Sequence, residues 1–427
     1  MTGTPQADIT LHTERVDGAF DCEGFTGLPS TWPCWIVLSA CGNTGLEWLV
    51  RRLREEIVRE LLLMAPAVRK VPPVKGCPRV IPSPTRNCMV STTYPQARKL
   101  LVLVGDSSAR LAVTPLVSDW LSSRPFYSIM PVYPIGETFL PQELSHLQIT
   151  SWRASIEEVA PALFAAAGLT SENFRVFISY KQDDTRELAD QLFDALSHLQ
   201  FDVFLDRFRI PPAANFQARL RQELADKAMV VLLESARASS SDWIRFEVGY
   251  ARKNRLGLVA VNLPGAPPVR GVREHMRVRI VAKDILPNGT LERQELDGVC
   301  ARLQREHQRS IVRRRYFLRQ SFAKALLHVH AGAPSYGADG MVRTASTAPP
   351  GRDYGVWLSA RPPELSDFHA VHASRLPLET AVVVGPADAL EPARRASLDW
   401  LAQQSTIRLE DEGHMLRLAR GIAKGAL

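Results

Sequence analysis

One carboxylate in residues 239–251, SSSDWIRFEVGYA, has a setting that suggests chemistry. Glu247 lies between Phe246 and Val248, on a segment that begins with residues that favour helix capping. Trp243 precedes it by four residues, so a helix places the indole and the carboxylate on one face. A glutamate on a surface helix is most often solvated. In a cleft beside an aromatic ring, however, its carboxylate can stabilise positive charge that develops during a reaction.

Strands and helices alternate regularly around this segment. Apolar runs predict strands at FRVFISY (174–180), FDVFLD (201–206), MVVLLES (229–235) and LGLVAVNLP (256–264). Amphipathic periodicity predicts helices at residues 184–199, 215–227 and 241–254. This alternation predicts a flavodoxin-like parallel sheet with right-handed crossovers. Because such sheets bind ligands beyond the carboxyl ends of their strands, we expect a site in the loops that follow the strands.

The motifs of this block resemble, in order, those of the TIR domain, the Toll/interleukin-1 receptor fold. VFISYKQDD resembles the first strand and its loop, and FDVFLDRFRIPPAANFQARL resembles the second strand and the long loop after it. MVVLLESARASSSDW resembles the fourth strand and a serine-rich turn, and WIRFEVGYA resembles the helix that carries a glutamate. The second-strand loop departs from the family, because Pro212-Ala213 stands where Pro-Gly is usual and an easy positive-φ position is lost.

The resemblance implies one of two functional classes. Some TIR domains are scaffolds that assemble through the second-strand loop, and others, many of them bacterial, cleave NAD at the nicotinamide–ribose bond. The enzymatic members keep a glutamate four residues after a tryptophan, as Glu247 and Trp243 do here. The resemblance therefore implies a bacterial-type NAD glycohydrolase with Glu247 as the catalytic residue and NAD as the substrate, without a cofactor or a metal. It also implies a homo-oligomer, because two TIR domains often complete one pocket in the enzymatic members.

The chemistry of this cleavage suits a carboxylate. Nicotinamide is a good leaving group because its departure neutralises the positive ring, and the transition state at the ribose is oxocarbenium-like. Glu247 would accept hydrogen bonds from ribose hydroxyls and stabilise that charge, while Trp243 would stack on a ring of the substrate. By the resemblance, further contacts to the nucleotide would come from Phe177, Ser179, Tyr180, Lys181, Arg207, Arg209 and Phe216. Asp183 and Asp184 are expected to cap the helix that follows.

The regions before this block are predicted from weaker patterns. Residues 1–30 lack periodicity and are expected to form an extended lead-in. Residues 31–170 predict an α/β domain, either a degenerate TIR-like copy or another α/β fold. The copy is suggested because 101–134 loosely follow the strand, helix and strand of 230–264 without the glutamate. The TIR domain itself is expected to span residues 171–290.

A basic helical segment is predicted at residues 291–330. Within it, residues 301–324 hold seven arginines and one lysine against one glutamate. The simpler interpretation is an amphipathic helix with a solvated basic face. The alternative is a site for nucleic acid or another polyanion at Arg313, Arg314 and Arg315.

The last part of the chain predicts a linker and a small module. Residues 331–352 are rich in Gly, Ala, Ser, Thr and Pro and are expected to be a linker. Residues 353–427 predict a small α/β module. Its Asp388 and His414 follow the order seen at the end of α/β-hydrolases, but the chain contains no G-x-S-x-G motif. Both residues are therefore expected to be structural.

Composition limits the remaining alternatives. The 427 residues carry a net charge of +7, without a long uncharged apolar run and without a signal-peptide pattern, so we expect a cytoplasmic protein with no membrane partner. The six cysteines lack CxxC spacing and predict reduced thiols rather than a metal site. Together with the resemblance, this favours an effector of antiphage or immune defence that self-association activates. The alternatives are a non-catalytic TIR scaffold and a TIR cyclase that makes an ADP-ribose-derived messenger.

Overall fold

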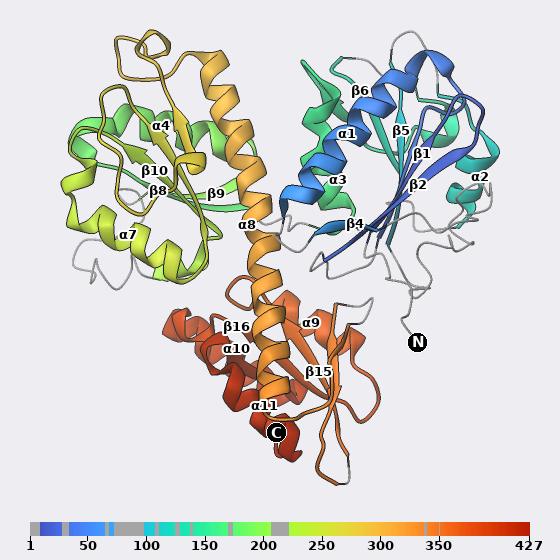
Figure 1. The fold of residues 1–427 in the computed structure, drawn as a ribbon, viewed down its shortest axis with the longest axis vertical. Helices are drawn as coiled ribbons and strands as arrows, with labels where there is room; N and C mark the ends of the chain where they lie inside the picture. The colour runs from blue at the N-terminus through green and yellow to red at the C-terminus, as the bar shows by residue number, and fades with distance from the viewer. Residues whose placement is uncertain are drawn as a thin grey trace. The chain divides into compact units, whose positions relative to one another are not determined.

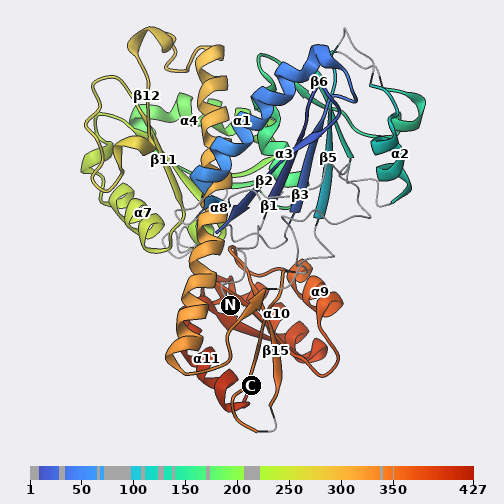
Figure 2. The same ribbon diagram turned by 45° about the vertical axis from the view of Figure 1, so that its right-hand side comes forward.

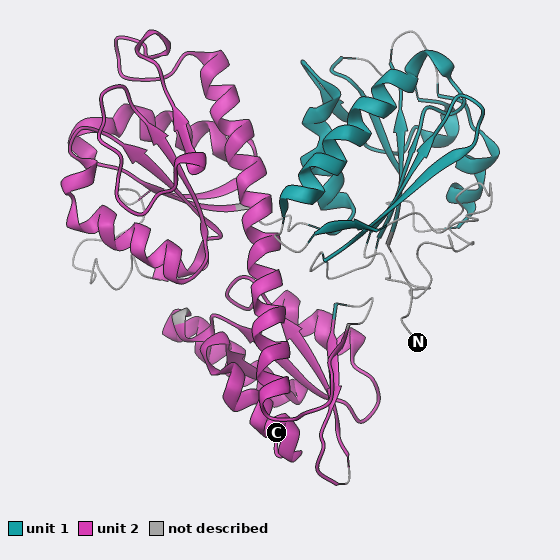
Figure 3. Ribbon diagram, in the orientation of Figure 1, with its two compact units in different colours: residues 1–171, 337–340 teal, residues 172–336, 341–427 magenta. Residues whose placement is uncertain are grey.

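The computed structural model describes residues 9–27, 34–64, 68–71, 98–106, 111–123, 129–136, 140–169, 174–205, 222–336, 340–349 and 351–427. The chain divides into two compact units, which comprise residues 1–171 with 337–340 and residues 172–336 with 341–427 (Figure 3). One sheet lies in the first unit and two lie in the second, and parallel pairs predominate in all but the last. The predicted α/β class is confirmed.

The first unit is built on a seven-stranded sheet with the order β4-β2-β1-β3-β5-β6-β7. Its elements are β1 (Ile9–Glu14), β2 (Phe20–Thr26), β3 (Cys34–Ser39), α1 (Glu47–Met64), β4 (Arg69–Val71), β5 (Arg98–Val104), α2 (Pro115–Ser122), β6 (Ile129–Pro134), β7 (Thr150–Trp152) and α3 (Ala160–Ala166). The extended lead-in expected at residues 1–30 is wrong for the described residues 9–27, because β1 pairs with both β2 and β3 inside this sheet. Ile9 and Leu11 are fully buried there, so the segment contributes to the core.

The second unit begins with a five-stranded parallel sheet with the order β12-β11-β10-β8-β9 (Figures 1 and 2). Its elements are β8 (Phe174–Ser179), α4 (Gln182–His198), β9 (Phe201–Leu205), β10 (Met229–Glu234), α7 (Asp242–Lys253), β11 (Gly257–Asn262) and β12 (Arg277–Arg279). Counted along the chain, the strands lie in the order 2-1-3-4-5, which is the flavodoxin-like arrangement. The predicted architecture of the central block is confirmed.

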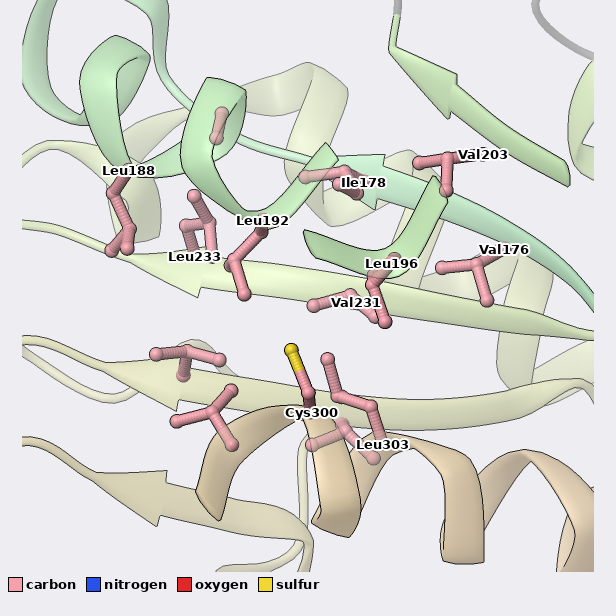
Figure 4. Close-up of a cluster of buried hydrophobic side chains, with 14 of the residues drawn as sticks. Val176, Ile178, Leu188, Leu192, Leu196, Val203, Val231, Leu233, Cys300 and Leu303 are labelled. Atoms are coloured by element: carbon pink, nitrogen blue, oxygen red, sulfur yellow. The ribbon is translucent and has the colours of Figure 1, made fainter. Parts of the chain in front are cut away.

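The two faces of this sheet have separate cores. On one face, side chains of the strands pack against α4 and the first part of helix α8 (Arg293–His328), as Figure 4 shows for Ile178, Leu192 and Leu303. On the other face, Phe177, Phe204 and Leu232 pack against α7. Alternate residues of a strand point to opposite faces, so the sequence of β8 decides which helix each of its side chains meets.

The strand order distinguishes the first unit from this sheet. In the first unit the parallel strands β1, β3, β5, β6 and β7 follow one another across the sheet in chain order. A TIR-like copy would begin with a strand in the middle of the sheet and move outward in both directions. The degenerate TIR-like alternative for residues 31–170 is therefore not supported, and the other α/β alternative describes the unit.

The end of the chain forms a five-stranded sheet with the order β13-β14-β15-β16-β17. Its elements are β13 (Ser335–Tyr336), β14 (Val342–Ala345), β15 (Asp353–Leu358), α9 (Leu365–Ser374), β16 (Thr380–Gly385), α10 (Pro392–Ser405), β17 (Ile407–Asp411) and α11 (Met415–Lys424). The predicted linker at residues 331–352 is therefore wrong in part, since β13 and β14 lie within it. Val342 and Thr344 are buried while Arg343 and Ala345 are half-buried, which is the alternation of a strand.

Helix α8 runs along both the TIR-like sheet and the C-terminal sheet (Figure 1). The arginines of its second half lie among these contacts. Arg314 is buried and pairs with both carboxylate oxygens of Glu412, at 2.9 and 3.0 Å, and Arg313 lies 3.0 Å from Glu306. Burial lowers the pKa of Arg315 to about 10. The expected solvated basic face is thus wrong for Arg314, whereas Arg313 and Arg315 are half-buried, and binding of a polyanion at these residues stays a prediction.

The pKa values of two buried thiols bear on the expectation that the cysteines are reduced. Cys41 and Cys300 are buried thiols outside disulfides, and burial raises the pKa of Cys41 to about 12 and that of Cys300 to about 11. Neither thiol is therefore ionised at neutral pH.

Within the described ranges, no helix combines the length and apolar character that crossing a bilayer requires.

A buried histidine should make the second unit sensitive to acid. His307 of α8 is fully buried, accepts a hydrogen bond from the backbone N–H of Arg175 at 3.2 Å, and packs edge-on against Phe201. Burial lowers its pKa to about 3. The unfolded chain therefore binds a proton between pH 6.5 and 3 that the folded chain does not, and stability falls as the pH falls through this range.

We predict that His307→Gln reduces this acid sensitivity. Glutamine can still accept the hydrogen bond but has no proton to gain. Between pH 7 and pH 5, the unfolding free energy of the wild type should fall by about 2 kcal/mol more than that of the variant. Urea unfolding at the two pH values measures the difference. An equal fall in both proteins would contradict the assignment.

Candidate functional site

The carboxylate of Glu247 lies against the carboxyl end of the central strand β8. Glu247 is only 3% exposed, and the Ser179 hydroxyl donates a hydrogen bond to its Oε2. Ser179 is the last residue of β8 and shares its face with Phe177, two residues earlier, so both side chains point towards α7. Glu247 is therefore a buried carboxylate at the edge of the sheet where a ligand is expected, and it is not solvated.

The sequence of α7 explains how the glutamate reaches this position. Ser241 caps the helix by accepting a hydrogen bond from the backbone N–H of Ile244 at 3.4 Å, as predicted for the serine run. The buried stripe of α7 consists of Ile244, Glu247, Val248 and Ala251, with helical spacing. Glu247 thus occupies a core position of an amphipathic helix. Such positions are almost always apolar, and a carboxylate there is a candidate for function.

Aromatic side chains run along α7 beside the carboxylate. The rings of Trp243 and Phe246 have centroids 5.1 Å apart, and those of Phe246 and Tyr250 are 6.2 Å apart. Trp243 is half-buried, one turn before Glu247, and packs against the core beneath α7. Its position beside Glu247 agrees with the predicted role as a stacking surface, which stays a prediction.

The first loop contributes fewer candidate residues than the resemblance implied. Phe177 is 1% exposed and stacks on Phe204 with centroids 5.2 Å apart, so its ring belongs to the core. Tyr180 is buried in the cluster on the opposite face of the sheet, with Leu188 of α4. Lys181 is half-buried at the start of α4. The structure brings Ser179 together with Glu247, and it directs Tyr180 away from them.

The remaining candidates come from the loop after β9. Arg207, Arg209 and Phe216 lie outside the described residues. Their predicted contacts with the nucleotide stay predictions.

Asp184 has a different role from the one expected. Its carboxylate accepts hydrogen bonds from the Ser235 hydroxyl at 2.8 Å, from the backbone N–H of Arg237 at 3.1 Å and from the Arg237 Nε at 2.7 Å. The Arg237 guanidinium and these other donors hold the pKa of the Asp184 carboxyl below its ordinary value. The expectation that Asp184 caps α4 is wrong, because the side chain instead joins the loop after β8 to the loop after β10. The flavodoxin-like order makes these two strands neighbours, and this order was the signal that could have predicted the contact.

A second buried carboxylate stands at the same edge of the sheet. Glu234, the last residue of β10, is fully buried and pairs with Arg277, whose Nε lies 2.9 Å from its Oε2. It also accepts hydrogen bonds from the backbone N–H of Val269 at 2.8 Å and from the Asn262 amide at 2.9 Å. These partners neutralise Glu234 and fasten the segment after β11. Glu234 is therefore structural.

Among the described residues, one cluster has the ligand types and spacing that a metal ion needs. Asp388, Asp411 and His414 place ligand atoms within 4.8 Å of one another. Asp411, however, already accepts hydrogen bonds from the backbone N–H groups of Asp388 at 2.8 Å and of Gly413 at 2.7 Å. Arg417 donates to the Nδ1 of His414 at 3.3 Å. These contacts fit the structural role expected for Asp388 and His414.

The strand order and the position of the glutamate define the class of fold to which this domain belongs. A parallel sheet with the order 2-1-3-4-5, which has a buried glutamate on the helix after its third strand, is a flavodoxin-like α/β domain. Within that class, residues 176–285 match the sequence profile of the TIR domain. This stretch is a TIR domain.

One solved structure similar to this chain is that of the activated Roq1 resistosome directly recognizing the pathogen effector XopQ, in its TIR domains. The sequence identity is 24% and the TM-score is 0.21, and the alignment covers 22% of this chain and 58% of that one. This chain thus spans less than two thirds of the similar structure. None of the curated proteins compared matches the chain.

We predict that the Asp184 contacts stabilise the carboxyl edge of the TIR domain. Asp184→Asn should lower the thermal unfolding midpoint by a few degrees at neutral pH, because it removes the charge from three hydrogen bonds. Since the pKa of Asp184 is lowered in the folded chain, this stabilisation should be lost only as the pH falls below the ordinary value of 3.8. Differential scanning calorimetry at neutral pH checks the prediction, with Asp194→Asn, at an exposed position of α4, as the control. Equal midpoints for Asp184→Asn and the wild type would refute it.

Proposed function

We propose that the TIR domain hydrolyses NAD at the nicotinamide–ribose bond, with Glu247 as the catalytic carboxylate. The observation that supports the proposal is the position of this carboxylate. It is buried at the carboxyl edge of the sheet, held by the Ser179 hydroxyl, and one helical turn from the half-buried indole of Trp243. A carboxylate rarely occupies a core position unless it is paired or serves a function.

The proposed reaction proceeds through charge that develops on the ribose. The bond between C1′ and the nicotinamide nitrogen breaks, and nicotinamide leaves with the electron pair as a neutral ring. Positive charge then develops at C1′ and the ring oxygen. Glu247 accepts a hydrogen bond from a ribose hydroxyl and stabilises this charge electrostatically. Water adds to C1′ and releases a proton, so NAD and water yield ADP-ribose, nicotinamide and a proton.

The burial of Glu247 is part of this mechanism. Interactions between charges are stronger in the interior of a protein than in water. A carboxylate held in place by the Ser179 hydroxyl also needs little reorganisation when the charge develops. Ser179 is then a positioning residue, since it acts through the orientation of Glu247.

The biological setting is proposed on the same basis. Cleavage of NAD in the cytoplasm would make this protein an effector of antiphage or immune defence, because loss of NAD stops an infected cell from supporting a phage. Self-association through the TIR domain would activate it. A cyclase would share the first step, with an atom of the same nucleotide replacing water at C1′.

We predict that Glu247→Gln abolishes most nicotinamide release. The amide keeps the size of the side chain but removes its charge, and loss of one electrostatic stabiliser costs about a hundred-fold or more in rate. Chromatography of NAD incubated with the self-associated protein measures nicotinamide, ADP-ribose and any cyclic product. Asp242→Asn, on the exposed first turn of the same helix, is the matched control and should react like the wild type. Equal nicotinamide release by Glu247→Gln and Asp242→Asn would remove Glu247 from the mechanism.

We also predict a smaller effect for Ser179→Ala. Removing the hydroxyl leaves Glu247 charged but less well oriented, so kcat should fall about ten-fold while KM changes little. Steady-state kinetics of NAD cleavage separates the two parameters. An unchanged kcat would show that Ser179 does not position the carboxylate.

A further inference from the structure

A cavity of about 240 Å³ lies within the second unit, away from Glu247. Three segments that are distant in sequence line it. These are the end of α7 with the turn after it, the second half of α8, and the residues that lead into α11. The cavity therefore lies where the TIR domain, the long helix and the C-terminal module meet.

The inner wall of the cavity carries a buried guanidinium. Arg314 pairs with Glu412 at 2.9 and 3.0 Å and donates a hydrogen bond to the backbone carbonyl of Asn254. Its Nε–H is buried and has no acceptor among the described residues. Because this Nε atom is enclosed by the protein, a ligand in the cavity would meet Arg314 through the charge of its guanidinium and not through this N–H.

The rim of the cavity adds two exposed cations. Arg255 lies with its guanidinium 4.1 Å from the centroid of the Phe317 ring, and Lys253 is the last residue of α7. Arg255 has a φ of 55°, a left-handed conformation that arginine rarely adopts and that glycine would adopt without strain. This conformation ends α7, since the backbone N–H of Leu256 donates to the Ala251 carbonyl at 2.9 Å, as at many helix C-termini. Three cations therefore face the single carboxylate of Glu412.

The rest of the lining combines apolar side chains with the polar Asn254 and Ser321. Phe317, Leu318 and Met415 contribute a ring and two aliphatic surfaces next to these cations. A site that joins cations to an apolar wall suits an organic anion better than an inorganic one. The volume is smaller than that of most pockets for drug-sized ligands, which limits the ligand to about the size of a sugar phosphate or a mononucleotide.

We propose that this cavity binds a small organic phosphate, with the phosphate held by Arg255 and Lys253 near the buried charge of Arg314 and the carbon body against Phe317 and Met415. The ligand would regulate the TIR domain, because Lys253 ends the helix that carries Glu247. A ligand that draws Lys253 and Arg255 together fixes the end of α7 against α8. The regulatory part rests on the proposed function, whereas the binding part does not.

The test of binding is calorimetric titration of the full chain with ribose 5-phosphate, AMP and inorganic phosphate. We expect one saturable site for at least one organic phosphate, with tighter binding than for inorganic phosphate. Arg255→Gln and Lys253→Gln should each weaken binding about ten-fold, because each removes one charge-assisted contact. Lys324→Gln is the matched control, since Lys324 is an exposed cation of α8 outside the cavity lining.

A variant that fills the cavity tests whether the ligand occupies this volume, without changing the charges at its rim. Ser321 is exposed at the cavity, so Ser321→Trp should abolish binding while the chain stays folded, as its circular dichroism would show. The proposal is overturned if neither organic phosphate saturates a site, if inorganic phosphate binds as tightly as both, or if Arg255→Gln binds like Lys324→Gln.

The regulatory part has its own readout. Addition of the bound phosphate should change the rate of NAD cleavage several-fold in the wild type and leave Ser321→Trp unaffected. Glu247→Gln should still bind the phosphate with wild-type affinity. Binding without any NAD cleavage by the wild type would thus overturn the proposed function alone, and cleavage that ignores the bound phosphate would overturn the regulation alone.

Discussion

The hydrogen bond from Ser179 to Glu247 is the interaction on which the functional account depends. A carboxylate at a core position of a helix is costly unless a partner satisfies it. Here the last residue of the central strand supplies a hydroxyl on the face that α7 covers. The same contact removes the carboxylate from bulk water and fixes its orientation. Burial and positioning are what electrostatic stabilisation of an oxocarbenium-like ribose requires.

Other contacts at this edge of the sheet keep the surroundings rigid. Asp184 joins the loop after β8 to Arg237 in the loop after β10. Glu234 and Arg277 form a buried ion pair that fastens the segment after β11. These pairs neutralise the neighbouring charges, so the carboxylates at this edge have separate roles. A buried ion pair is weak support for stability by itself, but breaking one leaves a buried charge without its partner.

Much of the TIR domain could be predicted from its sequence, because alternating apolar runs and amphipathic helices specify a parallel sheet, and the serine run marks the start of α7. Less could be predicted of the site. Ser179 and Tyr180 are adjacent, so they point to opposite faces of the sheet, and this parity separates Tyr180 from Glu247. Phe177 lies on the same face of the sheet as Ser179, but its ring is too deep in the core to meet a ligand.

The flanking regions were harder for different physical reasons. A short turn joins β1 to its antiparallel partner β2. The sequence between them therefore lacks the helical pattern that would have indicated a strand before it. The composition of residues 331–352 resembles a linker, although the residues of β14 within it alternate between buried and half-buried positions. The arginines of α8 resemble a solvated face, because the sequence of one helix does not reveal that a second domain packs on it. In each case long-range packing, rather than local pattern, decided the structure.

The most direct test of the central claim is a crystal structure of the TIR domain in the full chain with a non-cleavable NAD analogue. The account predicts that a hydroxyl of the nicotinamide ribose lies within about 3 Å of a Glu247 carboxylate oxygen, with Trp243 beside the nucleotide. An analogue bound elsewhere on the domain, with Glu247 still enclosed against Ser179 and out of its reach, would contradict it.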